Sequence, residues 1–336
     1  MENHNFTPLT DNQSRMLTDT RQLFEAYTHA LLNRDRFPGS MTWKKSGNAK
    51  YLIKILDSRG TQKSLGRESE ETTQRYRAFV EGKATAIDRF KTIEAKLDEQ
   101  ARFNKAARLG RVPTIAARVL RKLDRDRLMG RGVMVVGTNA LYAYEAEAAV
   151  MVDRAQTATI DIDLLWDVRQ RLQLAADMAE TGMIGILKSV DPTFEKTASY
   201  RATNAEGYFV DLIRPTSTPV EQDDGIRSIG GDGDLEAAEI EGLWWLKNVP
   251  ALSAVAVAED GYPVRLEAPH PMAYAAHKMW LSGRPNREAG KRRRDAAQGR
   301  LVRDLVKECL PSWRYDEQQL LAVPKQLRAL VSGMPA

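Results

Sequence analysis

An Asp-Ile-Asp triplet inside an apolar run constrains the fold of this chain more than any other feature. Residues 159–166 read TIDIDLLW, a composition typical of a β-strand. Side chains alternate between the two faces of a strand, so Asp161 and Asp163 share one face while Ile162 and Leu164 point to the other. Two carboxylates side by side repel each other unless a cation lies between them. Mg²⁺ typically binds one or two carboxylates together with substrate phosphates, so the triplet is a candidate metal site.

A Gly-Thr turn precedes this run and joins a short strand to a helix. Residues 133–136 read VMVV, and residues 139–149 are mostly good helix formers. Gly137 permits close backbone approach, the free N–H groups of a helix N-terminus attract anions, and the Thr138 hydroxyl adds a donor. The arrangement favours phosphate binding, although neither G-x-x-x-x-G-K-[ST] nor G-x-G-x-x-G occurs in the chain.

A third carboxylate, Asp211, lies inside the later strand-like run at 207–215, GYFVDLIRP. Asp is depleted in strands and costly to bury. A metal site would explain its presence, and so would a bend or a strand end.

These residues together resemble a known pattern. Gly137-Thr138, Asp161-Ile-Asp163 and Asp211 are similar to the Gly-Ser or Gly-Thr turn, D-x-D strand and later carboxylate of the DNA polymerase beta-type nucleotidyltransferase superfamily. The chain resembles a bacterial nucleotidyltransferase-like family related to the AbiE-type toxin nucleotidyltransferases, and the resemblance extends to the segments at 63–74, 101–113 and 277–298. Two departures are Thr138, where Ser is commoner, and the 24 residues (161 − 137) between Gly137 and Asp161.

The resemblance implies transfer of a nucleoside monophosphate (NMP) from a nucleoside triphosphate (NTP) to an acceptor hydroxyl. Asp161 and Asp163 would hold one Mg²⁺ and, with Asp211, a second, and Mn²⁺ could replace either ion. Asp211 could also accept the hydroxyl proton. Gly137 and Thr138 would bind the triphosphate, and pyrophosphate would leave.

Two further site positions come from the same resemblance. In toxin relatives a helical Lys and a later Asp complete the site, and Lys278 and Asp295 are the matching positions. Arg294 ends the basic run 291–294, which could contact phosphates of the nucleotide or of an RNA. Such a run is equally typical of a solvated helix face.

The chain divides into three regions of an α+β fold with mixed α/β character. We predict an accessory region at 1–125 with helices and a basic hairpin, a nucleotidyltransferase core with a small mixed β-sheet at 126–225, and a mostly helical region at 226–336 that completes the site. Helices are expected at 14–33, 68–110, 114–123, 168–180, 271–281, 287–309 and 316–331, strands at 183–187 and 199–203, and hairpins at 43–56 and 252–266. The Asp232-Gly-Asp234 segment is expected to be a solvated loop, because the calcium-loop pattern is missing.

Composition limits the class of protein. The single cysteine, Cys309, excludes an internal disulfide and fits a reducing compartment. The N-terminal residues lack the apolar segment of a secretory signal and no apolar run is long enough for a bilayer, so we expect a cytoplasmic protein with no membrane partner. The net charge of +5 permits an anionic partner without requiring one, because 45 acidic residues are spread along the chain.

The acceptor is the open question. RNA, especially tRNA-like RNA, is the first choice because of the basic segments, among them the hairpin that carries Trp43, Lys44, Lys45, Lys50, Tyr51 and Lys54. That hairpin is also compatible with an ordinary solvated surface. A protein hydroxyl is the second choice, and an inactive RNA- or partner-binding module on the same fold is the alternative from another class. A toxin or defence role follows from the resemblance alone.

Overall fold

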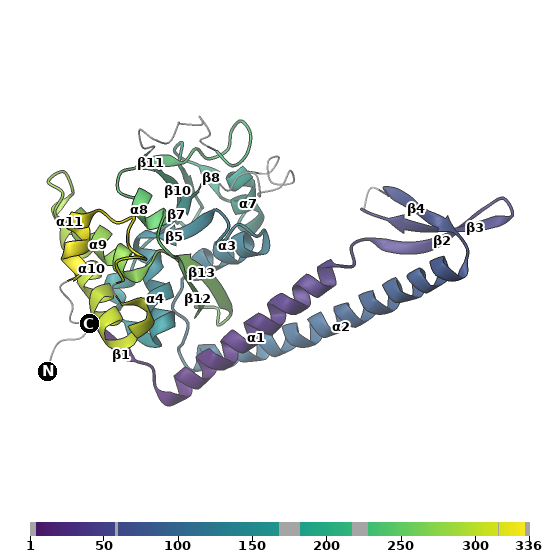
Figure 1. The fold of residues 1–336 in the computed structure, drawn as a ribbon, viewed down its shortest axis with the longest axis horizontal. Coiled ribbons are helices and arrows are strands. Elements are labelled where there is room, and N and C mark those ends of the chain that lie inside the picture. The colour runs from purple at the N-terminus through teal and green to yellow at the C-terminus, as the bar shows by residue number, and fades with distance from the viewer. Residues whose placement is uncertain (1–4, 58–59, 168–181, 217–227, 315, 333–336) are drawn as a thin grey trace.

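A head and a long arm make up the protein in the computed structural model (Figure 1). The structure describes residues 5–57, 60–167, 182–216, 228–314 and 316–332. It confirms the mixed α and β composition expected from the sequence. None of the described helices combines the length and the apolarity that crossing a bilayer requires.

The arm is an antiparallel pair of helices that carries a small sheet at its tip. Helices α1 (Asp11–Asp35) and α2 (Glu70–Ala106) pack along each other, and both begin at capping boxes, formed by Thr10 and Ser69. The tip sheet consists of β2 (Ser40–Ser46), β3 (Ala49–Ile55) and β4 (Gln62–Arg67), all antiparallel. The hairpin predicted at 43–56 is confirmed, whereas β4 is an additional strand.

A mixed sheet forms the centre of the head. Its strands run in the order β5 (Val133–Val136), β7 (Asp161–Trp166), β10 (Phe209–Pro215), β9 (Arg201–Thr203) and β8 (Glu195–Lys196), and β11 (Ala238–Ile240) pairs with β10. Strand β7 is antiparallel to β5 and parallel to β10. This sheet confirms the small mixed sheet predicted from the sequence.

Helices and a second hairpin complete the head. They are η1 (Gly137–Ala140), α4 (Leu141–Ala148), α5 (Arg154–Thr157), α7 (Gly182–Val190), α3 (Thr114–Arg125), α8 (Trp244–Lys247), α9 (Pro271–Ser282), α10 (Ala289–Cys309), η3 (Pro311–Trp313), α11 (Lys325–Ser332), and the hairpin of β12 (Leu252–Val257) and β13 (Pro263–Ala268). Strand β1 (Phe6–Pro8) pairs with β6 (Val150–Val152) where α1 leaves the head. One apolar core joins these elements, and Trp166, Tyr144 and Tyr274 are among its largest fully buried side chains.

The strand predicted at 183–187 is wrong, because this segment belongs to helix α7. A short apolar run does not reveal by its periodicity whether it forms a strand or a buried helix. The Asp234 carboxylate decides the outcome, since it accepts hydrogen bonds from the backbone N–H groups of Met183 (3.0 Å) and Ile184 (2.8 Å) at the start of the helix. Asp234 is therefore buried, which also corrects the expectation that its loop is simply solvated.

The helix predicted at 316–331 is shorter than expected, because α11 covers only its second half. The Asp316 carboxylate accepts a hydrogen bond from the backbone N–H of Gln318 (2.8 Å) and closes a turn. Pro324 then lacks the N–H group that a continuous helix would need. The helix predicted at 168–180 lies outside the described residues.

Candidate active site

The register of the central sheet brings the three carboxylates together. Strands β7 and β10 are parallel, and Asp163 lies directly beside Asp211. Asp161 is two residues before Asp163 and therefore shares its face. On the other side of β7, Val136 pairs with Asp163, so the turn at Gly137 begins next to the same carboxylate. The 24-residue separation of turn and triplet is therefore compatible with direct contact.

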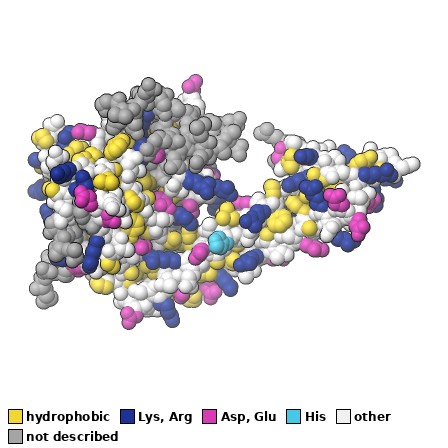
Figure 2. Space-filling model, viewed as in Figure 1, with side chains coloured by type: hydrophobic (Ala, Val, Ile, Leu, Met, Phe, Trp, Pro, Cys, Tyr) yellow, Lys and Arg dark blue, Asp and Glu magenta, His cyan; other side chains and the backbone are white. Residues whose placement is uncertain are grey.

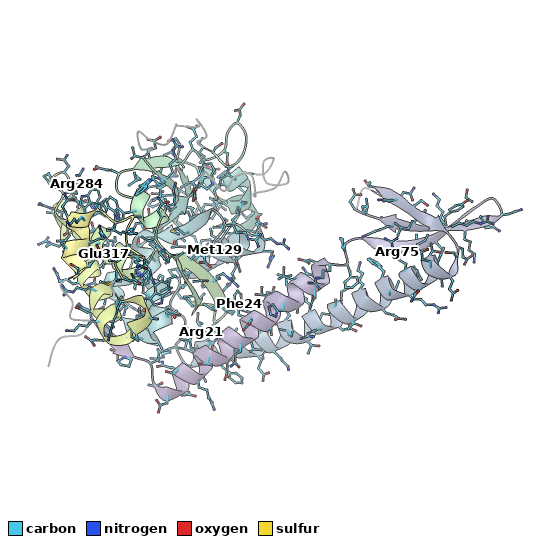
Figure 3. The ribbon with its side chains drawn as sticks, viewed as in Figure 1. Arg21, Phe24, Arg75, Met129, Arg284 and Glu317 are labelled. Atoms are coloured by element: carbon cyan, nitrogen blue, oxygen red, sulfur yellow. The ribbon has the colours of Figure 1, made fainter. Side chains whose placement is uncertain are left out.

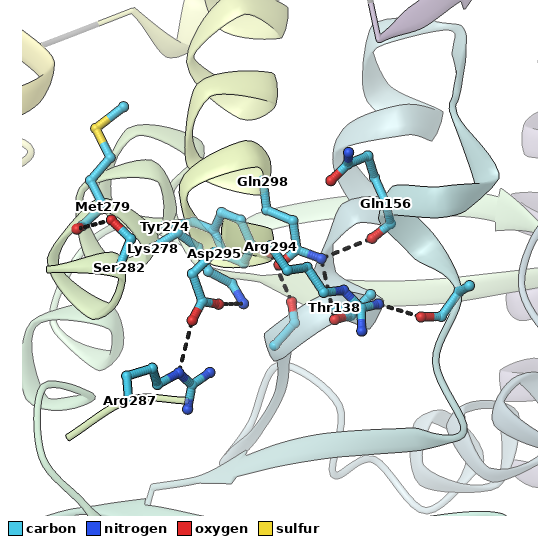
Figure 4. A network of polar contacts seen from close by, with 12 residues as sticks. Thr138, Gln156, Tyr274, Lys278, Met279, Ser282, Arg287, Arg294, Asp295 and Gln298 are labelled. Carbon is cyan, nitrogen blue, oxygen red and sulfur yellow. Dashed lines mark hydrogen bonds and ion pairs between the residues drawn. The ribbon is translucent and has the colours of Figure 1, made fainter. Parts of the chain in front are cut away.

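A cavity of about 470 Å³ collects every site residue that the sequence predicts. Carboxylates from β7 and β10 line it on one side, and side chains from α9 and α10 line it on the other. The predicted residues that line it are Gly137, Thr138, Asp161, Asp163, Asp211, Lys278, Arg294 and Asp295. Figure 4 shows the part contributed by α9, α10 and the turn.

Asp163 is the electrostatic centre of the cavity. No group among the described residues donates a hydrogen bond to its carboxylate, whereas Asp161 accepts one from the Thr159 hydroxyl. Burial, with the neighbouring charges of Asp161 and Asp211, raises the pKa of Asp163 to about 6, against the opposing charge of Lys278. A carboxylate that is destabilised in its charged form and faces a cavity can be stabilised by a cation.

The backbone at Gly137 packs so closely against the Asp163 carboxylate that a side chain would not fit there. Its φ is +62°, a region that favours glycine, and a Cβ atom would lie 2.0 Å from Oδ2 of Asp163. The Tyr274 hydroxyl donates a hydrogen bond of 3.0 Å to the Gly137 carbonyl from helix α9. The turn is therefore fixed from both sides, with glycine required at its first position.

The remainder of the turn is held by amide side chains. Gln298 on α10 donates through Nε2 to the Thr138 hydroxyl at 3.3 Å and to the Gln156 carbonyl at 2.8 Å (Figure 4). Asn139 donates to the backbone carbonyl of Asp161 at 2.6 Å. These bonds position the start of η1 beside the triplet. The structure therefore places the Gly-Thr turn between a strand and a helix, as the sequence predicts.

Lys278 and Asp295 form a buried ion pair in which a second cation takes part. The Lys278 Nζ atom lies 2.9 Å from Asp295 Oδ1, and the Arg287 Nε atom lies 2.8 Å from Asp295 Oδ2 (Figure 4). Burial lowers the pKa of Lys278, and Asp295 counteracts that shift. Asp295 thus positions two cations at the cavity wall. Arg287 was not among the predicted site residues, since nothing in the sequence shows which Arg of the 284–294 segment faces Asp295.

Helix geometry divides the basic run 291–294 into two pairs. Lys291 and Arg294 line the cavity together with Asp295 and Gln298, because positions three or four apart lie on one helix face. Arg292 and Arg293 are exposed and lie outside the cavity lining. Arg294 donates to the carbonyl of Ala158, and its buried Nε atom has no hydrogen-bond partner in the described part of the chain.

Arg201 is a site residue that the sequence did not reveal. Its guanidinium donates to both oxygens of Asp211, at 2.6 and 2.7 Å, and lies over the Phe209 ring at 4.6 Å. The hydrogen bonds to Asp211 raise the pKa of Arg201, so it remains a cation. Arg201 reaches the site because it pairs with Asp211 across the antiparallel strands β9 and β10. A single sequence does not specify this register, so it could not identify Arg201.

The carboxylates fit one cation better than two in this arrangement. Asp161 and Asp163 face the cavity, but both Asp211 oxygens are engaged by Arg201. Over the described ranges, no group of three His, Cys, Asp or Glu side chains could hold a metal ion together. A site with one or two carboxylates plus substrate phosphates is typical of Mg²⁺, so Asp161 and Asp163 suffice for one ion.

The cavity also has an apolar part to its lining. His277 borders it and packs edge-to-face against Trp245 with ring centroids 5.8 Å apart. Burial, together with the Lys278 charge, lowers the pKa of His277 to about 3, so the ring is neutral. The aliphatic side chains that line the cavity are those of Val136, Ile213, Ala238, Ile240, Leu243, Leu246 and Leu281. A lining with both charged and apolar side chains suits a ligand with phosphates and a flat ring.

Comparison with known proteins identifies a family match. Residues 114–322, more than half of the chain, match a family model described as Nucleotidyltransferase. All eight predicted site residues lie within the matched range, as do Arg201 and Arg287. No curated protein and no solved structure matches this chain.

Proposed function

This chain belongs to the nucleotidyltransferase family matched over residues 114–322, and from this membership we propose a Mg²⁺-dependent enzyme that moves an NMP from an NTP to a hydroxyl of an RNA. Family membership makes the protein a transferase of nucleotidyl groups. The metal, the acceptor and the roles of individual residues are the proposed part.

The unneutralised carboxylate of Asp163 carries the proposal. The fold places it between Asp161 and Asp211, against a glycine turn and opposite cationic side chains. This arrangement raises the free energy of the ligand-free protein, because three carboxylates share one face of the sheet. A triphosphate with a divalent cation would neutralise both sides of the cavity.

Two residues would hold the metal ion that the fold family implies. Asp161 and Asp163 offer carboxylate oxygens on one face, the ligand type that Mg²⁺ prefers. Bound there, the ion would neutralise charge that builds up on the triphosphate and on the leaving pyrophosphate. A second ion that includes Asp211 requires the Arg201–Asp211 pair to open, since both oxygens are occupied.

The opposite wall would bind the phosphates. Lys291, Arg294 and Lys278 line it, and the unpartnered Nε of Arg294 provides a buried donor. The Thr138 hydroxyl and the backbone N–H groups of the turn add further donors. Asp295 would act as a positioning residue, since it holds Lys278 and Arg287 and is itself buried.

The transfer step follows from this arrangement. The acceptor oxygen attacks the α-phosphorus, a new P–O bond forms, and the bond from the α-phosphorus to the bridging oxygen breaks. The electron pair of that bond leaves with pyrophosphate. Once the ion pair between Arg201 and Asp211 has opened, the Asp211 carboxylate accepts the proton of the acceptor hydroxyl. The cations on α9 and α10 stabilise the charge on the leaving group.

Two alternatives remain specific enough to test. The Arg201–Asp211 pair favours an inactive binding module, because it occupies the third carboxylate. A protein hydroxyl could replace the RNA hydroxyl without any change in the site.

A toxin role for the active enzyme would appear as growth arrest on expression, which Asp163→Ala should relieve. The cytoplasmic location stays a prediction, in keeping with the free thiol of Cys309.

The test separates these acceptors. The purified protein is incubated with each of the four NTPs carrying a label on the α-phosphate, with Mg²⁺, and with either cellular RNA or cellular protein. The proposal expects labelled material that ribonuclease destroys and protease does not. Protease-sensitive label would replace the RNA acceptor with a protein, and the absence of label with every NTP would favour the inactive module.

A further inference from the structure

The net charge of the molecule resides in the sheet at the tip of the arm. Residues 40–67 contain seven Lys or Arg and one Asp, a net charge of +6. The remaining 308 residues contain 43 basic and 44 acidic side chains, a net charge of −1. The moderate total of +5 thus conceals a strongly basic element on an otherwise balanced protein. Figure 2 shows Lys and Arg side chains over this tip.

One face of the tip sheet packs on the arm and the other does not. Trp43 lies against Tyr76 of α2 with ring centroids 5.9 Å apart, which identifies the covered face. Neighbouring residues point to the opposite face, where Lys44, Tyr51 and Arg67 lie in register across β2, β3 and β4. This row of two cations around an aromatic ring combines phosphate contacts with a stacking surface.

These side chains are not used within the protein. Lys44 and Arg67 are exposed, and neither has a carboxylate partner in the described part of the chain. By contrast, Lys54 lies over the Phe79 ring at 5.6 Å and contributes to packing. The row is therefore free to bind an external partner.

The arm holds the tip sheet at a fixed distance from the head. Helix α2 has 37 residues. At 1.5 Å per residue it is about 55 Å long. At its head end, the Tyr262 hydroxyl donates to Asp98 at 2.8 Å and Asn104 donates to the Gly261 carbonyl at 2.9 Å. The sheet therefore adds nothing to the core of the head, and a partner that binds both must be elongated.

A second group of free cations lies where the arm meets the head. A cavity of about 590 Å³ separates α1 and α2 from the head, with Phe24 and Met129 on opposite sides (Figure 3). Arg125, Arg127 and Arg131 line it, all three exposed and without a carboxylate partner among the described residues. Five carboxylates line the same cavity, those of Asp35, Glu94, Asp98, Asp124 and Asp260. Asp35, Asp124 and Asp260 already pair with arginines of the protein, so the free positive charge belongs to the three exposed arginines and not to the cavity as a whole. None of the predicted catalytic residues lines this cavity.

We propose that the row Lys44–Tyr51–Arg67 and the arginines at 125, 127 and 131 bind the phosphate backbone of one folded RNA that spans the arm. This inference rests on the proposed function, because it assigns the docking surface of the acceptor whose end enters the active site. A regular polyanion matches cations distributed along an arm of this length. An acidic protein segment or an anionic membrane is matched less well, since the free cations lie in two separate places, at the tip sheet and at the junction of the arm with the head.

Binding is measured without NTP, so that it does not depend on catalysis. Two fluorescein-labelled RNA stem-loops are used with the full-length protein, one short enough for the sheet alone and one long enough to reach the head. The test variant is Lys44→Gln with Arg67→Gln. The matched control is Arg300→Gln with Lys307→Gln, which removes two exposed cations from α10 of the head. Calorimetry with Mg²⁺ and NTP should give equal nucleotide affinity for all of these proteins.

The tip variant should bind both RNAs roughly tenfold more weakly, and the salt slope of log K against log [salt] should become shallower by about 2, one for each lost phosphate contact. Tyr51→Ala should weaken binding without changing that slope. Arg125→Gln with Arg131→Gln should weaken only the long RNA.

Equal RNA affinity in the tip variant and the control would overturn the inference. The inference would also be overturned if the tip variant lost binding to anionic vesicles or to acidic protein while its RNA affinity stayed unchanged. A loss of RNA affinity at the tip, together with no NMP transfer by the wild-type protein, would instead retain the docking surface and remove the proposed function.

Discussion

Replacing Asp163 by Asn should stabilise the metal-free protein. The pKa of Asp163 is raised from 3.8 to about 6 by burial and by the charges of Asp161 and Asp211. At about 1.36 kcal/mol per pKa unit, the charged carboxylate destabilises the folded state by about 3 kcal/mol at neutral pH. Asn has nearly the same shape and no charge, so Asp163→Asn should recover up to that amount. Asp88→Asn, which removes an exposed charge from α2, is the matched control and should have little effect.

The effect should depend on pH with a defined sign. Between pH 3.8 and about 6 the folded wild-type protein binds a proton at Asp163 that the unfolded chain has lost. The contribution of Asp163 to wild-type stability therefore falls as the pH rises through this range. The advantage of Asp163→Asn should be absent near pH 4, grow towards pH 6 and level off above about pH 7.

Thermal unfolding in EDTA at a series of pH values measures this difference. Asp163→Asn should raise the melting temperature at pH 7.5 by several degrees, while Mg²⁺ with NTP should raise that of the wild type and not that of the variant. A melting temperature that is lower in Asp163→Asn at pH 7.5, or unchanged across the series, would refute the view that the fold holds this carboxylate unneutralised.

Three further variants test the nucleotide contacts. Lys278→Met keeps the length of the side chain and removes its charge, so NTP affinity should fall by about 1.5–3 kcal/mol in calorimetry, and an unchanged affinity would exclude Lys278 from the site. Thr138→Val removes one hydroxyl donor, so the Mg²⁺-dependent affinity for NTP should fall by about 1 kcal/mol; equal affinity would show that the hydroxyl is not used. Arg292→Gln with Arg293→Gln should leave NTP affinity unchanged, because both side chains lie outside the cavity lining, and a loss would contradict the division of the basic run.

The local patterns in the sequence predicted the framework of the site. Alternation within 159–166 placed Asp161 and Asp163 on one face, and the run at 133–136 with its Gly-Thr turn predicted the strand, the turn and the following helix. These features depend on neighbouring residues, and a single sequence contains them. Lys278 and Asp295 came from the family resemblance, and the structure brings them together as an ion pair.

The contacts that the sequence missed are those between segments far apart in the chain. Arg201 reaches Asp211 through the register of β9 and β10, and Asp234 begins α7 from a loop about 50 residues later. The propensity of an apolar run gives no information about such a partner, so 183–187 was predicted as a strand. The arm shows the same limit, since its helices were predicted individually but their antiparallel packing and the third strand of the tip were not.

The fate of the α-phosphate tests the central claim most directly. The protein is incubated with Mg²⁺, cellular RNA and one NTP labelled at either the α- or the γ-phosphate, in parallel with Asp161→Ala and Asp163→Ala. The account predicts that the α-label enters RNA, that the γ-label appears only in pyrophosphate, and that EDTA or either substitution abolishes both. Incorporation of the γ-label, or wild-type incorporation of the α-label by either variant, would contradict NMP transfer by these carboxylates.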